Sequence, residues 1–161
     1  MDSKIQELLK SDKTVIAFDV DGVLAPMEFG EYNHYYADDD VWAEEVANGT
    51  DFYKDVRVVK TFKDFISKKD KNRIYVITKV MNENEFNQKL DFLEKGYGIL
   101  KDNCFMVLKD FDKLYKLEEI KKLYPDLEDK DIAIVDDTTD ILTYVMQNSK
   151  FSTIHISSFL K

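Results

Sequence analysis

Five short runs of apolar residues, separated by stretches with helical spacing, constrain the fold of this chain more than any other feature. The runs cover residues 14–19, 73–78, 104–108, 132–136 and, more weakly, 152–156. In the first four runs the apolar residues are not interrupted by polar ones, which is typical of strands covered on both faces. Helical patterns are expected at about 58–69, 83–95, 114–124 and 138–147. This alternation predicts a three-layer α/β fold, with helices on both faces of about five parallel strands joined by right-handed crossovers.

Length and charge narrow the class of protein. The 161 residues predict one domain over 1–161. With 23 basic against 32 acidic residues, the net charge of −9 argues against general nucleic-acid binding or an anionic-membrane partner. No apolar run reaches the length of about 18 residues that a membrane span needs. The polar first ten residues do not look like a signal peptide, so we expect a cytoplasmic protein. The lone Cys104 lies in an apolar run and is expected to be a buried, unreactive thiol.

Residues 25–57 do not fit the alternating pattern. They combine acidic residues 38–40 with seven aromatic residues, namely Phe29, Tyr32, Tyr35, Tyr36, Trp42, Phe52 and Tyr53. Connections this long are usually functional loops or lids. A short helix at about 41–48, ended by Gly49, is expected within it. The insert either packs down on the sheet edge or forms a small lid, with Tyr32, Tyr35 and Trp42 as candidates for a ring-stacking wall.

Carboxylates stand where two of the predicted strands end. Asp19 and Asp21 follow the first strand, and Asp136 and Asp137 end the fourth. Ligands of open parallel sheets bind beyond the carboxyl ends of the strands, so these four side chains are expected to converge. Carboxylates that close repel one another, and a divalent cation offsets the repulsion. An all-oxygen site of this kind favours Mg²⁺, which in turn suits a phosphate ligand.

These residue types predict phosphoryl transfer. Asp19 would attack phosphorus, and Asp21 would protonate the leaving oxygen and later deprotonate the attacking water. Gly22 permits the turn that places Asp21. Thr78, at the end of the second strand, would supply a hydroxyl donor to the phosphoryl oxygens. Lys79 and Asn82 follow it and are candidate substrate-binding residues.

A cation is also needed beside the phosphoryl group, and a lysine before the fourth strand would supply it. The candidates are Lys109, Lys113 and Lys116. We expect Lys116, because it opens the run at 116–123, the start of the third predicted helix, and would point at the strand ends. Lys113 lies one turn earlier and is the alternative.

Four motifs in order resemble those of the haloacid dehalogenase-like (HAD) phosphohydrolase superfamily. Residues 15–24 are similar to its first motif, a hydrophobic strand followed by Asp-x-Asp-Gly. Residues 74–78 are similar to the second motif, which ends in Ser or Thr. Lys116 falls where the third motif's lysine is expected, and residues 132–140 resemble the fourth motif with its acidic pair.

The resemblance implies a Rossmann-like sheet in the order 5-4-1-2-3 and a Mg²⁺-dependent phosphatase with an aspartyl-phosphate at Asp19. It also implies metal binding by Asp19, the backbone carbonyl of Asp21, and Asp136, with Asp137 assisting the metal or holding Lys116. The gaps between the motifs leave no room for a large cap domain. The site would then be open to a phosphorylated small molecule or nucleotide-like substrate, or be closed by a second subunit of a homo-oligomer.

Other functions of the same fold remain open. A phosphotransferase or mutase would pass the phosphoryl group to a sugar instead of water, although without a large cap hydrolysis is favoured. A non-catalytic HAD-like binding protein is the other alternative. A response-regulator receiver domain is also a small, Asp-phosphorylated α/β protein, but its acidic, Thr and Lys residues follow the strands in a different order.

Overall fold

One five-stranded parallel sheet forms the centre of the molecule, in the order β3-β2-β1-β4-β5. The computed structural model describes residues 4–26 and 38–159. The strands are β1 (Val15–Phe18), β2 (Ile74–Lys79), β3 (Cys104–Val107), β4 (Ile132–Asp136) and β5 (Ser152–His155). Every described pairing is parallel. The predicted fold class and strand order are confirmed, because 5-4-1-2-3 is the same order taken from the other edge.

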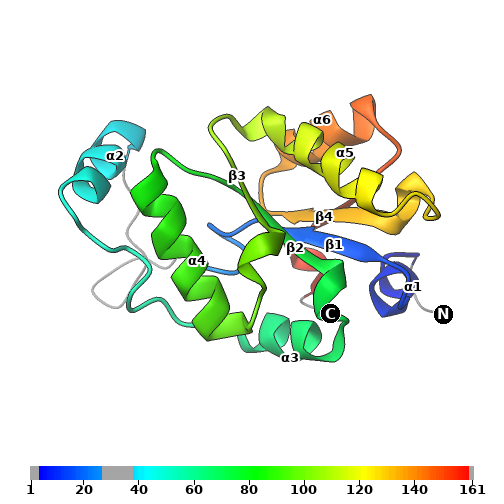
Figure 1. The fold of residues 1–161 in the computed structure, drawn as a ribbon. Coiled ribbons are helices and arrows are strands. Elements are labelled where there is room, and N and C mark those ends of the chain that lie inside the picture. The colour runs from blue at the N-terminus through cyan, green and yellow to red at the C-terminus, as the bar shows by residue number, and fades with distance from the viewer. Residues whose placement is uncertain (1–3, 27–37, 160–161) are drawn as a thin grey trace.

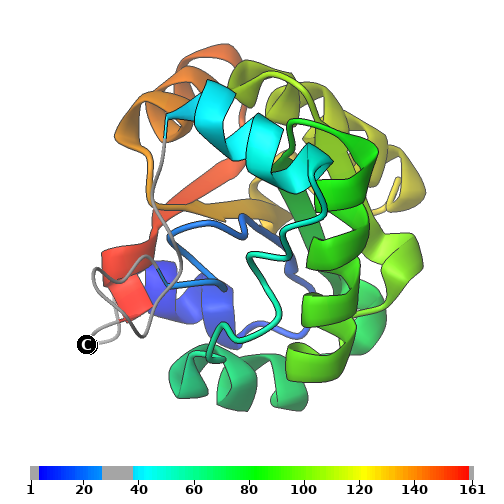
Figure 2. The same cartoon turned by 90° about the vertical axis from the view of Figure 1, so that its left-hand side faces the viewer.

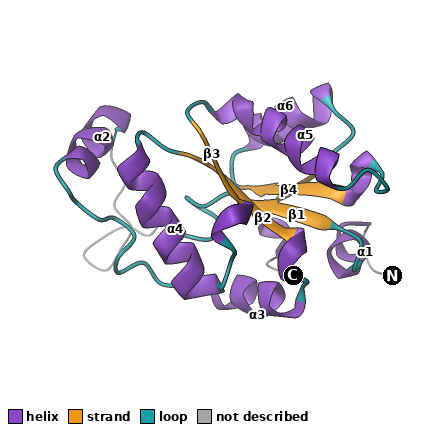
Figure 3. Cartoon of the chain, viewed as in Figure 1, coloured by secondary structure: helices purple, strands orange, loops and turns teal. Residues whose placement is uncertain are grey.

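Six α-helices surround this sheet in the described part of the chain (Figures 1 and 3). They are α1 (Lys4–Lys10), α2 (Asp39–Ala47), α3 (Lys60–Lys68), α4 (Glu83–Tyr97), α5 (Lys113–Leu123) and α6 (Thr139–Asn148). Short 3-10 turns are η1 (Lys71–Arg73), η2 (Lys101–Asn103), η3 (Asp110–Asp112), η4 (Asp129–Asp131) and η5 (Ile156–Phe159). Each of these α-helices is too short or too polar to cross a lipid bilayer.

The two faces of the sheet carry separate apolar cores. On one face Ile16 and Phe18 of β1 pack with residues of α1, α3 and α4. On the other face Val15 and Ala17 pack with α5 and α6. All four of these β1 side chains are fully buried. The uninterrupted apolar runs of the central strands β1, β2 and β4 follow from this, because these strands have almost no surface left for water.

The register of the central strands sets the position of the acidic residues. Phe18 of β1 pairs with Val135 of β4. The next residue on each strand is an aspartate, so Asp19 and Asp136 come to lie side by side at the carboxyl edge. The backbone N–H of Asp19 donates to the carbonyl of Val135 at 2.9 Å and holds this alignment.

The described part of the 25–57 insert reaches that same edge. Its helix α2 begins at Asp39, two residues before the predicted start, and ends at Ala47. Gly49, two residues after the helix, has a left-handed backbone conformation. Figure 2 looks onto the carboxyl end of the sheet and shows α2 beside the start of α4. Phe29, Tyr32, Tyr35 and Tyr36 lie outside the described residues.

Candidate metal and phosphate site

Three aspartates meet at the carboxyl ends of β1 and β4. One carboxylate oxygen from each of Asp19, Asp136 and Asp137 lies within 4.8 Å of the other two. Asp19 and Asp136 are buried, at 8% and 0% exposure. Oxygen-only ligands of this kind fit a hard divalent cation, Mg²⁺ among them. The convergence predicted for these three residues is confirmed, and they form a possible metal site.

The electrostatics of Asp19 also fit a cation. The pKa of the Asp19 carboxyl is raised from its ordinary value of 3.8 to about 7. Burial is the largest cause and the charge of Asp136 adds to the rise, whereas Lys113 opposes it. Burial and the charge of Asp136 likewise raise the pKa of Asp137. Without a cation the three aspartates therefore resist being ionised together, and a divalent ion would offset the repulsion between their negative charges.

Gly22 allows the loop after β1 to approach this site closely. Its φ is +77°, in the left-handed region that favours glycine. A Cβ at this position would lie only 2.2 Å from Oδ2 of Asp137. A side chain here would displace that carboxylate, so glycine is required both by the backbone and by the space.

Lys113 is the lysine at the acidic cluster. Its Nζ lies 3.0 Å from Oδ1 of Asp19 and 2.8 Å from Oδ2 of Asp136, and the side chain is buried. Burial favours its neutral amine, but Asp19 and Asp136 outweigh burial and raise the pKa of Lys113. The ammonium therefore stays charged between the two carboxylates.

The expected placement of Lys116 at the strand ends is wrong. Lys116 pairs with Glu119 of its own helix at 3.0 Å and lies over the Phe105 ring. The reason is the start of α5, which begins at Lys113 directly after the η3 turn. Lys116 lies one turn further along the helix, and at 1.5 Å per residue that carries it past the acidic cluster.

Asp21 stands apart from the acidic cluster. Its Oδ1 accepts a hydrogen bond from the Tyr53 hydroxyl at 2.7 Å, and its Oδ2 lies 2.7 Å from Nζ of Lys89. Its carboxylate is not among the three that group together in the described residues. The side chain of Asp21 nevertheless lines the same pocket as Asp19, so the two predicted catalytic carboxylates face one cavity.

The residues expected around the second motif divide between the site and the scaffold. Thr78 is fully buried, and its Oγ1 accepts from Nζ of Lys89 at 2.9 Å. Lys79 lines the pocket, where it pairs with Asp39 at 3.0 Å. Asn82 is used differently, because its side chain caps α4 by accepting from the N–H of Glu85 at 3.0 Å. It is not among the residues that line the pocket.

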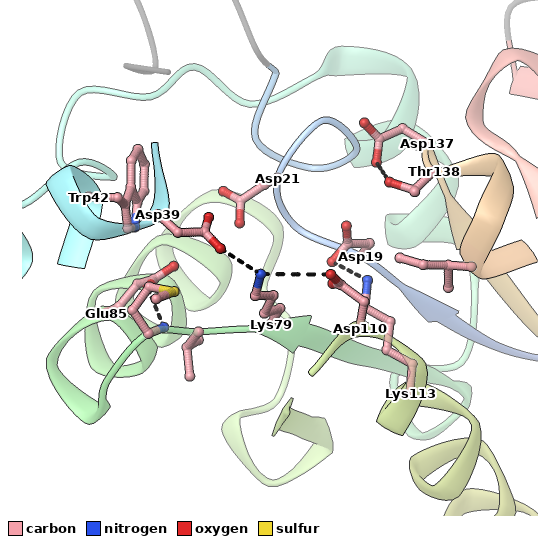
Figure 4. A pocket seen from close by; sticks show the side chains of 13 residues that line it. Asp19, Asp21, Asp39, Trp42, Lys79, Glu85, Asp110, Lys113, Asp137 and Thr138 are labelled. Carbon is pink, nitrogen blue, oxygen red and sulfur yellow. Dashed lines mark hydrogen bonds and ion pairs between the residues drawn. The ribbon is translucent and has the colours of Figure 1, made fainter. Parts of the chain in front are cut away.

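The pocket itself has a volume of about 250 Å³ and lies over the strand ends (Figure 4). Residues after β1 and β4 contribute Asp19, Asp21 and Asp137, and the start of α5 contributes Lys113. The insert contributes Asp39 and Trp42 of α2. The Trp42 ring stacks on Phe52, with 3.9 Å between the ring centroids. The insert thus supplies part of the pocket wall. Of the suggested stacking residues, Tyr32 and Tyr35 lie outside the described part.

Sequence reasoning missed Lys89 and Glu85. Both are buried on α4, on the same helix face as Phe92 and Leu93. Glu85 and Lys89 are four residues apart, and Leu93 and Tyr97 follow Lys89 at four and eight residues. This spacing places all of them on one buried helix face and is a signal that could have revealed a buried ion pair. Nothing in the sequence links Tyr53 to Asp21, because that contact is purely tertiary.

The chain matches no protein-family model and no curated protein. The geometry of the site and the resemblance of its motifs are therefore the basis for a function.

Proposed function

We propose that this protein is a Mg²⁺-dependent phosphatase that hydrolyses phosphomonoesters through an aspartyl-phosphate on Asp19. The observation that carries the proposal is the grouping of Asp19, Asp136 and Asp137, with the Lys113 ammonium between the first two. The motifs that resemble the HAD superfamily support the same chemistry, since they supply these residues in the expected order.

The aspartates would hold the metal ion, and Lys113 would complete the positive environment. Asp19, Asp136 and Asp137 would ligate Mg²⁺, with the backbone carbonyl of Asp21 as a further ligand by resemblance. Mg²⁺, when bound, supplies positive charge that offsets the phosphoryl charge and keeps Asp19 unprotonated. Thr78 and Lys113 would add a hydroxyl and an ammonium for the phosphoryl oxygens.

Two carboxylates would then share the reaction. A carboxylate oxygen of Asp19 forms a bond to phosphorus while the ester P–O bond breaks, and Asp21 gives a proton to the leaving oxygen. Asp21 next takes a proton from water as the water oxygen bonds to phosphorus. The bond between Asp19 and phosphorus breaks, which releases inorganic phosphate and restores both side chains.

The test is phosphate release from nucleoside monophosphates, sugar phosphates, phosphoamino acids and phosphorylated oligonucleotide ends. It is run with Mg²⁺ and with EDTA, on the wild type and on Asp19→Asn. Release that needs both Mg²⁺ and Asp19 is the expected result, and the best substrate identifies the class. Phosphate release that persists in Asp19→Asn, or none from wild-type protein that binds Mg²⁺, would overturn the proposal. Consumption of the ester without free phosphate would point to transfer to another acceptor.

A further inference from the structure

A second lysine is buried beside the site, and it contacts residues of two different motifs. Lys89 on α4 is fully buried. Its Nζ lies 2.7 Å from Oδ2 of Asp21, 2.9 Å from Oγ1 of Thr78 and 2.9 Å from Oε1 of Glu85. It also donates to the backbone carbonyl of Lys79 at 2.6 Å.

Neutralising Glu85 accounts for only one of these contacts. Burying an ammonium is unfavourable unless its partners are well placed, so a buried lysine destabilises the fold relative to an apolar residue when those partners are missing. Glu85 already accepts a hydrogen bond from the Met81 N–H at 2.8 Å. The remaining contacts of Lys89 go to the ends of the first two motifs, and they bring together side chains that follow β1 and end β2.

The position of Asp21 depends on Lys89 and Tyr53 together. The Tyr53 hydroxyl donates to Oδ1 and the Lys89 ammonium to Oδ2, each at 2.7 Å. Tyr53 is itself 2% exposed, and its ring lies 5.5 Å from Nζ of Lys89. Two donors on two oxygens hold a carboxylate in one orientation, here at the wall of the pocket.

The contact with Thr78 also has a direction. A hydroxyl has one proton to give, and the Lys89 ammonium can only donate. Oγ1 of Thr78 therefore accepts from Lys89, and its proton points to another acceptor. The nearest one described, the carbonyl of Lys79, is 3.3 Å away, which is long for a hydroxyl donor.

We propose that Lys89 is a positioning residue that, together with Tyr53, orients the acid–base carboxylate Asp21 and the hydroxyl of Thr78. This rests on the proposed phosphatase function. Lys89 does not touch the substrate. It acts through Asp21, so its loss falls mainly on the step in which the leaving oxygen takes up a proton.

The test compares two esters that differ in their need for that proton. The para-nitrophenolate of para-nitrophenyl phosphate leaves without a proton, whereas the alkoxide of β-glycerophosphate needs one. General acid catalysis contributes about 10²- to 10⁴-fold. In Lys89→Met we expect kcat to fall ~10²-fold for β-glycerophosphate and less than about tenfold for para-nitrophenyl phosphate. The ratio of the two kcat values is the readout, since general loosening of the structure would lower both.

Lys101→Met is the matched control. Lys101 also lies near two carboxylates, Asp91 at 3.1 Å and Glu94 at 3.3 Å, but on the surface and away from the pocket. Its ratio is expected to equal that of the wild type. If Lys89→Met does not fold, as judged by circular dichroism, Tyr53→Phe replaces it, because that change removes a single hydroxyl. We expect its ratio to shift by about fivefold in the same direction.

Equal losses on both esters, in Lys89→Met or in its replacement, would overturn the positioning role while leaving the phosphatase intact. Absence of Mg²⁺-dependent hydrolysis of either ester by the wild type would overturn the proposed function, and this inference with it. The two failures are therefore separate results of one experiment.

Discussion

Replacing the proposed nucleophile tests the site through stability as well as through activity. Asp19→Asn keeps the shape of the side chain and an oxygen that can accept from Lys113, now at 3.0 Å from Oδ1. It removes one negative charge from a group that also contains Asp136 and Asp137. The substitution should abolish Mg²⁺-dependent turnover and, in the absence of metal, leave the protein more stable than the wild type.

The size of the effect follows from the pKa of Asp19, which burial raises from 3.8 to about 7. At about 1.4 kcal/mol per pKa unit, ionising this group in the folded protein costs up to about 4 kcal/mol. The side chain is only 10% exposed, so solvent screens little of this cost. Because Lys113 loses an ionic partner in the variant, we expect a net gain of about 1–3 kcal/mol.

The sign of the pH dependence is fixed by the raised pKa. The stability that Asp19 contributes is fully present below its unfolded pKa of 3.8 and is lost as the pH rises through about 7. The advantage of the variant should therefore grow between about pH 5 and about pH 8. In saturating Mg²⁺ the wild type should instead be the more stable protein, because Mg²⁺ binding stabilises the wild type and stabilises the variant far less.

Urea unfolding in EDTA and in Mg²⁺ at these two pH values measures each difference. A variant that is less stable than the wild type in EDTA at the higher pH would refute the reasoning, because Asp19 would then be a structural residue and not a strained ligand. A Mg²⁺ effect of equal size on both proteins would place the metal elsewhere.

Three further predictions concern other residues of the site and the core. Lys113→Met should lower the free energy of unfolding, measured in urea, by about 3–5 kcal/mol, because it leaves buried carboxylates unpaired. Lys116→Met should lower it by less than about 1 kcal/mol. Similar losses in the two variants would contradict the assignment of Lys113 as the lysine of the acidic cluster. Gly22→Ala should weaken Mg²⁺ binding, measured by calorimetry, by about tenfold or more, because the new methyl group displaces a ligand. Gly49→Ala is its control, since that glycine also has a positive φ but has nothing within 4 Å of a Cβ, and a comparable loss there would count against the steric explanation. Burial raises the pKa of the Cys104 thiol to about 12, so it should react with the disulfide reagent DTNB at about pH 8 only after unfolding, and fast labelling of the native protein would be inconsistent with this.

Local patterns determined the strands and the carboxylates at their ends. A strand buried on both faces must be apolar at every position, so β1, β2 and β4 were predicted to within one residue at each end. The loop after such a strand is where polar residues resume, which is why Asp19 and Asp136 stand out in the sequence. Their convergence needs parallel strands, which follow from the alternation of strands and helices, and it needs β1 and β4 to be neighbours, which follows from the resemblance of the motifs.

The choice of lysine depended on where a helix begins relative to the sheet. Lys113 and Lys116 occupy similar positions in the helical pattern, and both precede β4. The η3 turn brings the first residue of α5 to the strand ends, and only that placement gives Lys113 its contacts with Asp19 and Asp136. The helix itself was predicted from about residue 114, one residue from its observed start at Lys113, so the error lay in which lysine of the first turn was expected to face the strand ends.

The sequence by itself determined the α/β class, the strand order through the resemblance of its motifs, and the aspartates of the candidate metal site. Only the tertiary structure decided which cations and hydroxyls meet those carboxylates. Lys89 and Asp21 are 68 residues apart in the chain and 2.7 Å apart in space. A buried strand is defined by its own residues, because burial on both faces constrains each of them. The partner of a buried charge is defined by how α4 packs on the sheet, which no local pattern encodes.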